Sequence, residues 1–316
     1  MNALRIVFFG TPEFAVPSLE ALHQSRHRVV AVVTTPDRER GRGLNVQPSQ
    51  VKLCASRHQL PVLQPEELTD PTFLAELRRY AADLFVVVAF RILPPEVFTM
   101  PPRGTVNLHA SLLPKYRGAA PINWAIINGE RETGVTTFFI EEKVDTGVIL
   151  CQRQVPIGPD ETAGQLHDRL ALAGAQLLVE TVDGIAEGKL VAVPQQGEPS
   201  RAPKIVREMC EIDWRKPAVQ IHNLVRGLCP FPGAFTYLEG KILKLYRTQV
   251  LKPYGHGKRP GQVARVDRKG GIIHVATGEG VLALIELQPE GKRRMTAEEF
   301  LQGHLLQPGT ILGKSQ

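Results

Sequence analysis

The stretch GTVNLHASLLPKYRGAAPI, residues 104–122, joins a short strand to an irregular loop. The strand is predicted at residues 105–109, and the alternation of side chains along a strand puts Asn107 and His109 on one face. The run 111–121 that follows is rich in Gly and Pro, which is typical of irregular backbone that can shape a pocket. Because open α/β sheets bind ligands at the carboxyl ends of their strands, we expect the reactive site here.

Apolar runs alternate with helical patterns on both sides of this stretch, which predicts a doubly wound α/β domain with a mostly parallel sheet. The run DLFVVVAF, residues 83–90, is almost continuously apolar, as expected of a central strand buried on both faces. The other expected strands are 4–9, 28–34, 134–140 and 147–155, and the expected helices are 14–23, 48–58, 71–80 and 162–187.

The last third of the chain has a different pattern. Periodicity is lost after residue 189, in a segment that gathers Pro, Gly and Ser, and a helix is predicted at 217–227. Short β patterns then recur at spacings typical of a small barrel. The predicted organisation of this 316-residue chain is a first domain at 1–189, a linker at 190–208 and a second domain at 209–316. The expected barrel strands are 240–246, 260–266, 271–276 and 280–287.

The net charge of +6 is unevenly distributed. Residues 1–202 carry 20 Lys and Arg against 22 Asp and Glu, whereas residues 203–316 carry 18 against 10. A surplus of positive charge confined to one part predicts an anionic partner for that part, most plausibly nucleic acid. On composition alone, a surface charge that only keeps the protein soluble remains an equal alternative.

Other features of the sequence limit the kind of protein. No apolar run approaches the roughly 20 residues that span a bilayer, and no basic-then-apolar leader precedes the first strand, so we expect no membrane contact and a cytoplasmic location. The four cysteines are far apart and offer no zinc template. His23 and His27 are expected to be surface histidines rather than metal ligands.

The central stretch also carries a motif. Asn-x-His-x-Ser-Leu-Leu-Pro-x-Tyr-Arg-Gly, residues 107–118, with Asp-Thr-Gly at 145–147, resembles the signature of enzymes that take a formyl group from 10-formyltetrahydrofolate. Four further matches extend the resemblance, over almost the whole chain, to the methionyl-tRNA formyltransferases. These matches are FGTPEFAVP at 9–17, LHDRL at 166–170, APKI at 202–205 and LQPEGKRRM at 287–295.

The resemblance implies that Asn107, His109 and Asp145 are the catalytic residues. Formyl transfer requires an amine to attack a carbonyl through an oxyanion intermediate. Asn107 is expected to donate to the developing negative charge, and His109 to donate to it and transfer a proton. The family motif places Asp145 beside His109, where a carboxylate assists proton transfer. The amine is itself the nucleophile, so we expect neither a covalent enzyme intermediate nor a metal.

The co-substrate implied by the resemblance is 10-formyltetrahydrofolate, with Ser111, Leu112, Leu113 and Pro114 wrapping it, partly through backbone groups. A cis bond between Leu113 and Pro114 is expected from the family. The segment AFRILP, residues 89–94, is one residue shorter than the usual Ala-Tyr-Gly-x-Ile-Leu-Pro. It resembles glycinamide ribonucleotide formyltransferases instead, in which this segment lines the pterin pocket.

The acceptor implied by the resemblance is methionyl initiator tRNA. The Arg- and Gly-rich loop 35–44 corresponds to an insertion that probes the acceptor end of the tRNA, which makes Arg42 the expected tRNA-binding residue. The resemblance also implies a Rossmann-like formyltransferase domain, an OB-like C-terminal barrel that binds tRNA, and a monomer.

Three alternative classes of protein fit the sequence less well. Glycinamide ribonucleotide formyltransferases generally lack a second domain, so residues 204–316 argue against them. Sugar-nucleotide formyltransferases can have two domains, but the basic C-terminal part and the arginine loop are not expected of them. A non-catalytic RNA-binding protein on an old enzyme scaffold is disfavoured because Asn107, His109 and Asp145 are all present.

Overall fold

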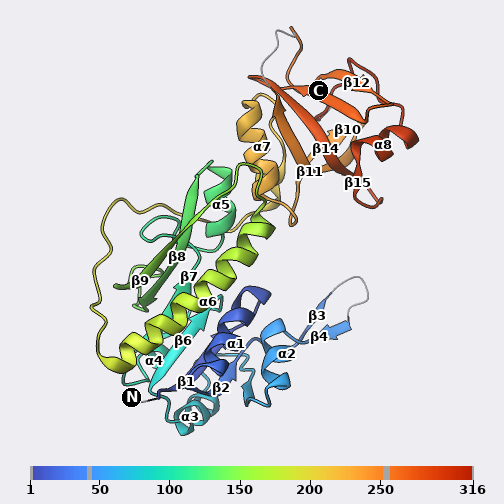
Figure 1. Cartoon of the computed structure of the whole chain (residues 1–316). Helices are drawn as coiled ribbons and strands as arrows, with labels where there is room; N and C mark the ends of the chain where they lie inside the picture. The colour runs from blue at the N-terminus through green and yellow to red at the C-terminus, as the bar shows by residue number, and fades with distance from the viewer. Residues whose placement is uncertain (1–2, 41–44, 252–256, 315–316) are drawn as a thin grey trace. The chain divides into compact units, whose positions relative to one another are not determined.

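The computed structural model describes residues 3–40, 45–251 and 257–314. The chain divides into two compact units, each described below by itself (Figure 1). The first unit comprises residues 1–121, 133–156 and 167–202, and the second comprises 122–132, 157–166 and 203–316. The second unit therefore takes two segments, 122–132 and 157–166, from earlier in the chain than its main part. The predicted domain boundaries at 189 and 209 stay a prediction.

Among the described residues, the first unit contains a seven-stranded sheet in the order β5-β2-β1-β6-β7-β8-β9. β5, β2, β1, β6 and β7 are parallel, and β8 is antiparallel to β7. This confirms the doubly wound, mostly parallel sheet predicted from the sequence. The strands are β1 Arg5–Gly10, β2 Arg28–Val33, β5 Val62–Leu63, β6 Leu84–Val88, β7 Thr105–His109, β8 Glu132–Phe139 and β9 Ile149–Pro156.

Helices cover both faces of this sheet. Odd-numbered residues of β1 and β6, such as Phe9 and Phe85, pack in one apolar cluster with Phe73 and Leu77 of α3. The even-numbered residues of these strands are fully buried as well. The helices of this unit are α1 Val16–Gln24, α2 Gln50–Arg57, α3 Pro71–Arg79, α4 Pro95–Phe98 and α6 Ala163–Glu187, with a 3-10 turn η1 at Glu13–Ala15. The first four residues of α6 belong to the second unit.

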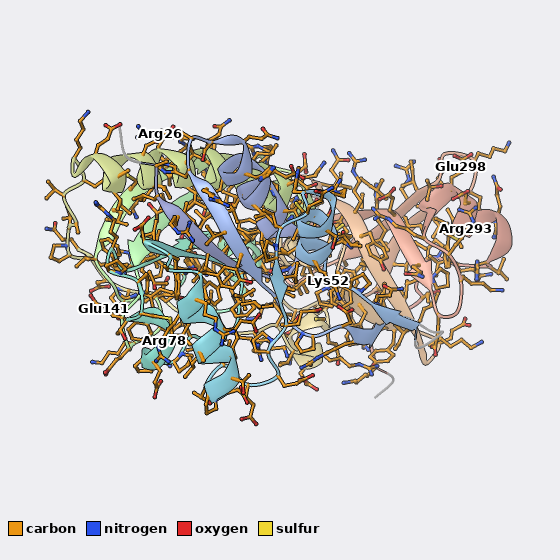
Figure 2. The ribbon with its side chains drawn as sticks, turned by 90° about the horizontal axis from the view of Figure 1, so that it is seen from below. Arg26, Lys52, Arg78, Glu141, Arg293 and Glu298 are labelled. Atoms are coloured by element: carbon orange, nitrogen blue, oxygen red, sulfur yellow. The ribbon has the colours of Figure 1, made fainter. Side chains whose placement is uncertain are left out.

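α3 illustrates how the sequence determines a helix and its orientation. Asp70 caps the helix by accepting hydrogen bonds from two backbone N–H groups of its first turn, and Pro71 occupies the first helical position. Phe73 and Leu77 lie four residues apart and are buried, whereas Arg78 is exposed and points away from the helix (Figure 2).

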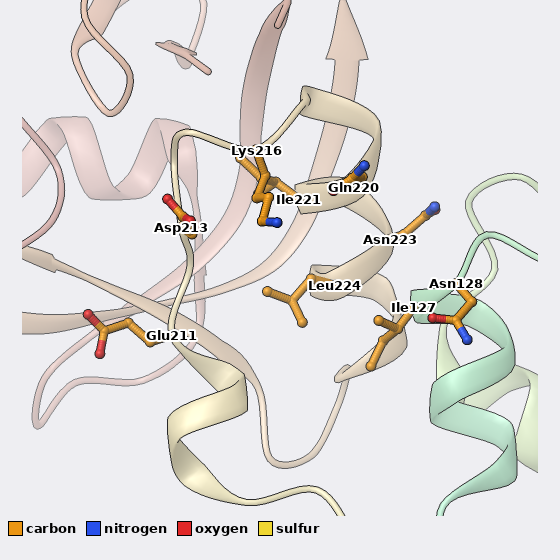
Figure 3. A pocket seen from close by; sticks show the side chains of 9 residues that line it. All are labelled: Ile127, Asn128, Glu211, Asp213, Lys216, Gln220, Ile221, Asn223 and Leu224. Carbon is orange, nitrogen blue, oxygen red and sulfur yellow. The ribbon is translucent and has the colours of Figure 1, made fainter. Parts of the chain in front are cut away.

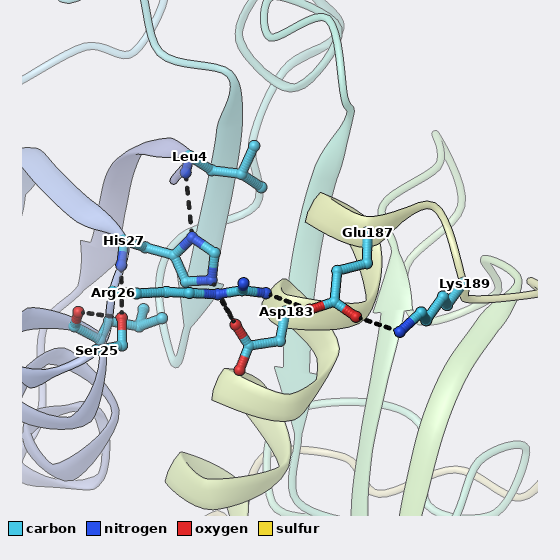
Figure 4. A network of polar contacts seen from close by, with 8 residues as sticks. Leu4, Ser25, Arg26, His27, Asp183, Glu187 and Lys189 are labelled. Carbon is cyan, nitrogen blue, oxygen red and sulfur yellow. Dashed lines mark hydrogen bonds and ion pairs between the residues drawn. The ribbon is translucent and has the colours of Figure 1, made fainter. Parts of the chain in front are cut away.

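His27 is buried, which corrects the prediction that it lies at the surface. The residue is 5% exposed, and its Nδ1 accepts a hydrogen bond from the backbone N–H of Leu4 at 3.1 Å (Figure 4). That contact leaves the proton on Nε2, which donates to Asp183 of α6 at 3.0 Å. Arg26 bridges Asp183 and Glu187 on the same helix. The expectation of a solvent-exposed histidine fails because a backbone donor and a carboxylate satisfy both ring nitrogens.

The second unit is built on an antiparallel sheet with the order β10-β11-β14-β13-β12, in which β15 pairs with β14. Residues 309–313 form backbone hydrogen bonds to both edges, to Val263 of β12 and to Tyr237 of β10. The two edges are thereby joined through one segment, which agrees with the predicted small barrel. The strands are β10 Ala234–Leu238, β11 Lys241–Leu251, β12 Val263–Asp267, β13 Ile272–Ala276, β14 Val281–Pro289 and β15 Met295–Thr296.

The second unit also contains the helices α5 (Pro121–Ile127, all but its first residue), α7 (Ala218–Gly227) and α8 (Ala297–Gly303), and a 3-10 turn, η2, at Arg207–Cys210. α8 begins with a capping box. The side-chain hydroxyl of Thr296 accepts a hydrogen bond from the backbone N–H of Glu299, and the carboxylate of Glu299 accepts one from the backbone N–H of Thr296. The arginine-rich loop of the first unit contains the short hairpin β3 (Arg38–Arg40) and β4 (Asn45–Gln47). No helix in the part of the chain that the structure describes has the length and hydropathy needed to cross a membrane.

His222 is expected to make the stability of the second unit depend on pH. It is buried on α7, with Nδ1 at 3.1 Å from Thr248 Oγ1 and Nε2 at 3.4 Å from the carbonyl oxygen of Pro159. Burial lowers the pKa of His222 because the charged imidazolium is poorly solvated there. Below the unfolded-state pKa of about 6.5, the unfolded chain therefore binds a proton that the folded chain does not.

We expect the unfolding temperature to decrease as the pH is lowered from about 7 to about 5, and His222→Gln to reduce this decrease because Gln carries no titratable group. The measurement is thermal unfolding at several pH values. His304→Gln, a substitution of a half-exposed histidine in the same unit, is the control. Equal pH dependence in His222→Gln and the parent protein would contradict this prediction.

Candidate active site

β7 carries Asn107 and His109 to the carboxyl edge of the parallel strands. Val87 of β6 pairs with Asn107, and Thr136 of β8 pairs with His109. His109 is 7% exposed and Asn107 is half-buried. The side-chain amide of Asn107 makes no hydrogen bond to any residue that the structure describes, so its two donors are available to a ligand.

The hydrogen bond from His109 Nε2 to the carbonyl oxygen of Tyr116, at 2.9 Å, determines the protonation of the ring. A backbone carbonyl can only accept, so Nε2 must carry a proton, and Nδ1 is the nitrogen that can gain or lose one. Tyr116 has φ of 60°, a left-handed conformation that is rare for a bulky residue and costs roughly 1–3 kcal/mol. The bond from His109, and another from the N–H of Tyr116 to Ser200 Oγ at 2.9 Å, hold it there.

The structure brings Asp145 next to His109, with 3.8 Å between Asp145 Oδ2 and His109 Nδ1. This separation is too long for a direct hydrogen bond but is suitable for a bridging water or for attraction to an imidazolium. The same oxygen accepts a hydrogen bond from the N–H of Gly118 at 2.8 Å. The segment that carries Asp145 passes close to the backbone of β8, and this approach requires a glycine at position 147. A Cβ there would lie 1.7 Å from the carbonyl oxygen of Phe139.

Gln195 is a supporting residue that the sequence analysis missed. Its Nε2 donates to the carbonyl oxygens of Asp145 and Gly147, both at 2.9 Å. Its Oε1 accepts from Arg117 Nη2 at 2.6 Å. Gln195 lies in the segment predicted to be a linker, and nothing in its local sequence marks it, because all three partners are distant in the chain.

The loop after β7 is attached to the sheet through Thr136. Thr136 Oγ1 donates to the carbonyl oxygen of Ser111 at 2.6 Å and accepts from the N–H of Leu113 at 3.2 Å. The bond between Leu113 and Pro114 is cis, as predicted. Ser111 and Leu113 are buried, while Leu112 and Pro114 are half-buried and accessible to a ligand.

The segment 89–94 lies beside this loop, because it follows β6, the neighbour of β7. Arg91 donates to the carbonyl oxygens of Pro65 and Glu66, both at 2.8 Å, and burial lowers its pKa, with the charge of Arg38 adding to the effect. Ile92 is 75% exposed, which leaves an apolar surface available at this edge. Arg42, the predicted tRNA-binding residue, lies outside the described residues.

A separate cavity of about 570 Å³ lies within the second unit (Figure 3). None of the predicted site residues lines it. Its two carboxylates are already paired, Glu211 with Lys314 at 2.7 Å and Asp213 with Arg215 at 2.8 Å. The arrangement that fits acyl chemistry is therefore the one around His109. The cavity is lined by Ile127, Asn128, Glu211, Asp213, Lys216, Gln220, Ile221, Asn223 and Leu224.

A pair of family matches defines the class of protein. Residues 4–182 match the formyl transferase family, and residues 204–305 match the formyl transferase C-terminal domain. Together these matches cover most of the chain and include every residue predicted for the site. The class is therefore that of the formyltransferases, which are enzymes.

Relatives that match over their full length identify the family within this class. The chain is 48% identical over 313 residues to the methionyl-tRNA formyltransferase of Pelotomaculum thermopropionicum, with 99% of both chains covered. It is 49% identical over 317 residues to that of Geobacter sulfurreducens, with 100% of this chain and 98% of the relative covered. The chain belongs to the methionyl-tRNA formyltransferase family.

Solved structures share the fold at low identity. HypX from Aquifex aeolicus in complex with tetrahydrofolic acid matches with a TM-score of 0.66 and 18% identity, covering 98% of this chain, which spans 51% of that protein. The N-formyltransferase from Helicobacter canadensis, in complex with folinic acid and dTDP-3-aminofucose, matches with a TM-score of 0.65 and 20% identity, covering 89% and 98% of the two chains.

We expect Gln195→Ala to lower the turnover number several-fold while changing the KM of each substrate little, because Asp145 and Gly147 lose their shared donor. Loss of these hydrogen bonds should also lower the free energy of unfolding by about 1–3 kcal/mol. Formylation kinetics and denaturant unfolding measure the two effects. Gln196→Ala, at the exposed neighbouring position, is the matched control. Turnover as high as that of the control would mean that Asp145 is held without Gln195.

Proposed function

We propose that this protein transfers a formyl group from 10-formyltetrahydrofolate to the α-amino group of methionine on initiator tRNA. The observation that carries the proposal is the convergence of Asn107, His109 and Asp145 at the carboxyl edge of the sheet. Relatives that are named methionyl-tRNA formyltransferases and match over the full length support the acceptor. Fold neighbours solved with tetrahydrofolic or folinic acid support the donor.

In the proposed mechanism, Asn107 donates its unpaired amide hydrogens to the formyl oxygen as negative charge develops on it. His109 acts through Nδ1, because its Nε2–H is engaged by the Tyr116 carbonyl. Protonated Nδ1 donates to the same oxygen and supplies the proton for the departing nitrogen. Asp145, at 3.8 Å, stabilises the imidazolium and assists removal of the proton from the incoming amine. 10-Formyltetrahydrofolate supplies the activated formyl carbonyl.

The residues around this edge are suited to a folate. Ile92 offers an exposed apolar side chain after β6, and Ser111, Leu112, Leu113 and Pro114 follow the adjacent β7 with ordered backbone groups. A buried hydroxyl without a partner among the described residues, Thr11 Oγ1, follows β1, which pairs with β6. A pterin, which is flat and carries several donors and acceptors, could use both kinds of surface.

We assign the recognition of tRNA to two basic parts of the chain. Residues 203–316 hold the whole positive surplus, 18 basic against 10 acidic residues, and phosphate contacts dominate affinity for nucleic acids. Arg42 in the arginine-rich loop is the residue proposed to contact the acceptor end. We further propose that the first domain, 1–189, carries out the chemistry, that 190–208 is a linker, and that 209–316 binds tRNA. The protein is proposed to be a cytoplasmic monomer whose reaction uses no metal.

The test uses purified protein, 10-formyltetrahydrofolate and, separately, methionylated initiator and elongator tRNAs, with formylmethionine detected by mass spectrometry. We expect formylation largely confined to the initiator. Absence of formylation on either tRNA, with folate still bound, would contradict the proposed acceptor and direct the search to amino sugars on nucleotides, the kind of ligand in one fold neighbour.

The same assay tests Arg42. We expect Arg42→Ala to reduce the preference for initiator over elongator tRNA, because a phosphate or base contact near the acceptor end is lost. Arg28→Ala, an exposed arginine at the start of β2, is the control for loss of one positive charge. An unchanged preference in Arg42→Ala would contradict the assigned role of the loop.

For the chemical step, we expect His109→Ala to lower kcat by about 10²–10⁴ while the affinity for tRNA stays nearly constant, because a general acid–base group is removed. Pre-steady-state formylation and tRNA binding measure the two effects, and an unfolding temperature checks the fold. His304→Ala serves as the control. A large loss of tRNA affinity with little change in kcat would reject a catalytic role for His109.

A further inference from the structure

Helices α1 and α2 bring a carboxylate, a thiol and an imidazole together away from the candidate active site. Glu20 Oε1 lies 3.2 Å from Cys54 Sγ, and Glu20 Oε2 lies 2.8 Å from His58 Nε2. The ligand atoms of these three residues are all within 4.8 Å of one another. Among the residues that the structure describes, these are the His, Cys, Asp and Glu side chains that lie close enough together to hold one metal ion.

The positions in the sequence explain the arrangement. Cys54 and His58 lie four residues apart on α2 and its C-cap, so they share one side of that helix. Glu20 and His23 lie three apart on α1 and share a side in the same way. The ring of His23 lies 4.2 Å from the ring of His58, centroid to centroid. Each helix thus contributes a histidine and an acidic or thiol group to one shared surface.

We propose that Glu20, Cys54 and His58 bind a divalent cation of the zinc type. Thiolate sulfur, imidazole nitrogen and carboxylate oxygen are the donors that zinc prefers. Zinc–ligand bonds of about 2.0–2.3 Å place the ligand atoms of a tetrahedral site about 3.3–3.6 Å apart. The observed distances from Glu20 to Cys54 Sγ and to His58 Nε2, 3.2 and 2.8 Å, would each have to increase by less than about 1 Å.

Without a cation, the same three groups form a hydrogen-bonded cluster in which Cys54 and His58 both donate to Glu20. Burial raises the pKa of Glu20, but the two hydrogen bonds and the nearby charges of His58 and Arg57 together lower it overall, which favours the ionised carboxylate. Burial, with Glu20, raises the pKa of Cys54 to about 12, so the thiol keeps its proton. Binding forms the metal–sulfur bond, and the thiol proton leaves to solvent.

The charge and the accessibility of the cluster both suit a dication. Once Cys54 has lost its proton, its thiolate and the Glu20 carboxylate supply two negative charges. The side chains of Glu20 and His58 are 29% and 25% exposed, which leaves a path from solvent, while Cys54 is fully buried. The positive charge of Arg57, at 3.5 Å from Glu20 Oε1, disfavours a bound cation. The Arg57 side chain is 68% exposed, however, and can turn away.

A cation here would link the two helices rather than take part in formyl transfer. α1 follows β1, and α2 follows the arginine-rich hairpin, so the bond would join two segments that lie more than 25 residues apart in the chain. The absence of local zinc spacing around the cysteines does not contradict the site, because two helices share its ligands.

The test is titration of the full-length, metal-free protein with Co²⁺ under a reductant that does not bind metal. We expect one equivalent to produce a thiolate-to-cobalt charge-transfer band, which Zn²⁺ then removes. Cys54→Ser should abolish the band, and His58→Gln and Glu20→Gln should each weaken binding at least tenfold. Cys151→Ser, which removes a half-buried cysteine on β9, is the matched control and should retain the band.

A second measurement is independent of the folding of Cys54→Ser. Zn²⁺ should raise the unfolding temperature of the parent protein and of Cys151→Ser, and raise that of His58→Gln by less at the same concentration, since a ligand that binds only the folded state stabilises it according to its affinity. No cobalt band, a band that persists in folded Cys54→Ser, or an equal zinc-dependent shift in His58→Gln would each overturn the proposal.

Discussion

The hydrogen bond from His109 to the carbonyl of Tyr116 is the contact on which the arrangement of the site depends. It spans seven residues, from the last position of β7 to a loop residue in a left-handed conformation. The bond orients the imidazole, assigns the proton to Nε2, and fixes the start of the turn that presents Gly118 to Asp145. A single contact thereby links the strand, the loop and the carboxylate.

The position of the Tyr116 carbonyl, and therefore this hydrogen bond, depends on the segments that hold the loop in place. Tyr116 is bonded to Ser200, and Asp145 to Gln195, so the stretch between α6 and the second unit supports both sides of the site. A segment without helix or strand periodicity resembles a linker when only the sequence is considered. In the structure, its side chains also satisfy backbone groups that irregular loops leave unpaired.

The sequence was sufficient where local pattern and burial agree. The strand at 105–109, the buried strand around Val86 and the parallel order follow from apolar periodicity, and the position of Asn107 and His109 on one face follows from strand alternation. The prediction failed for His27, whose burial depends on the N–H of Leu4. Gln195 and the cluster at Glu20 were missed for the same reason: their partners are distant in the chain, and no local pattern encodes them.

The constraint on His109 has a further chemical consequence. Because Nε2 donates to a carbonyl, the ring nitrogen left for a ligand is Nδ1, which faces Asp145. Loops after β7 and β8 must therefore be ordered at the same time for the ring and the carboxylate to act together. Each loop is held by bonds to the other or to residues 195–200, so disorder in one releases the rest. We therefore expect the site to become ordered as one unit, although its residues come from three distant parts of the chain.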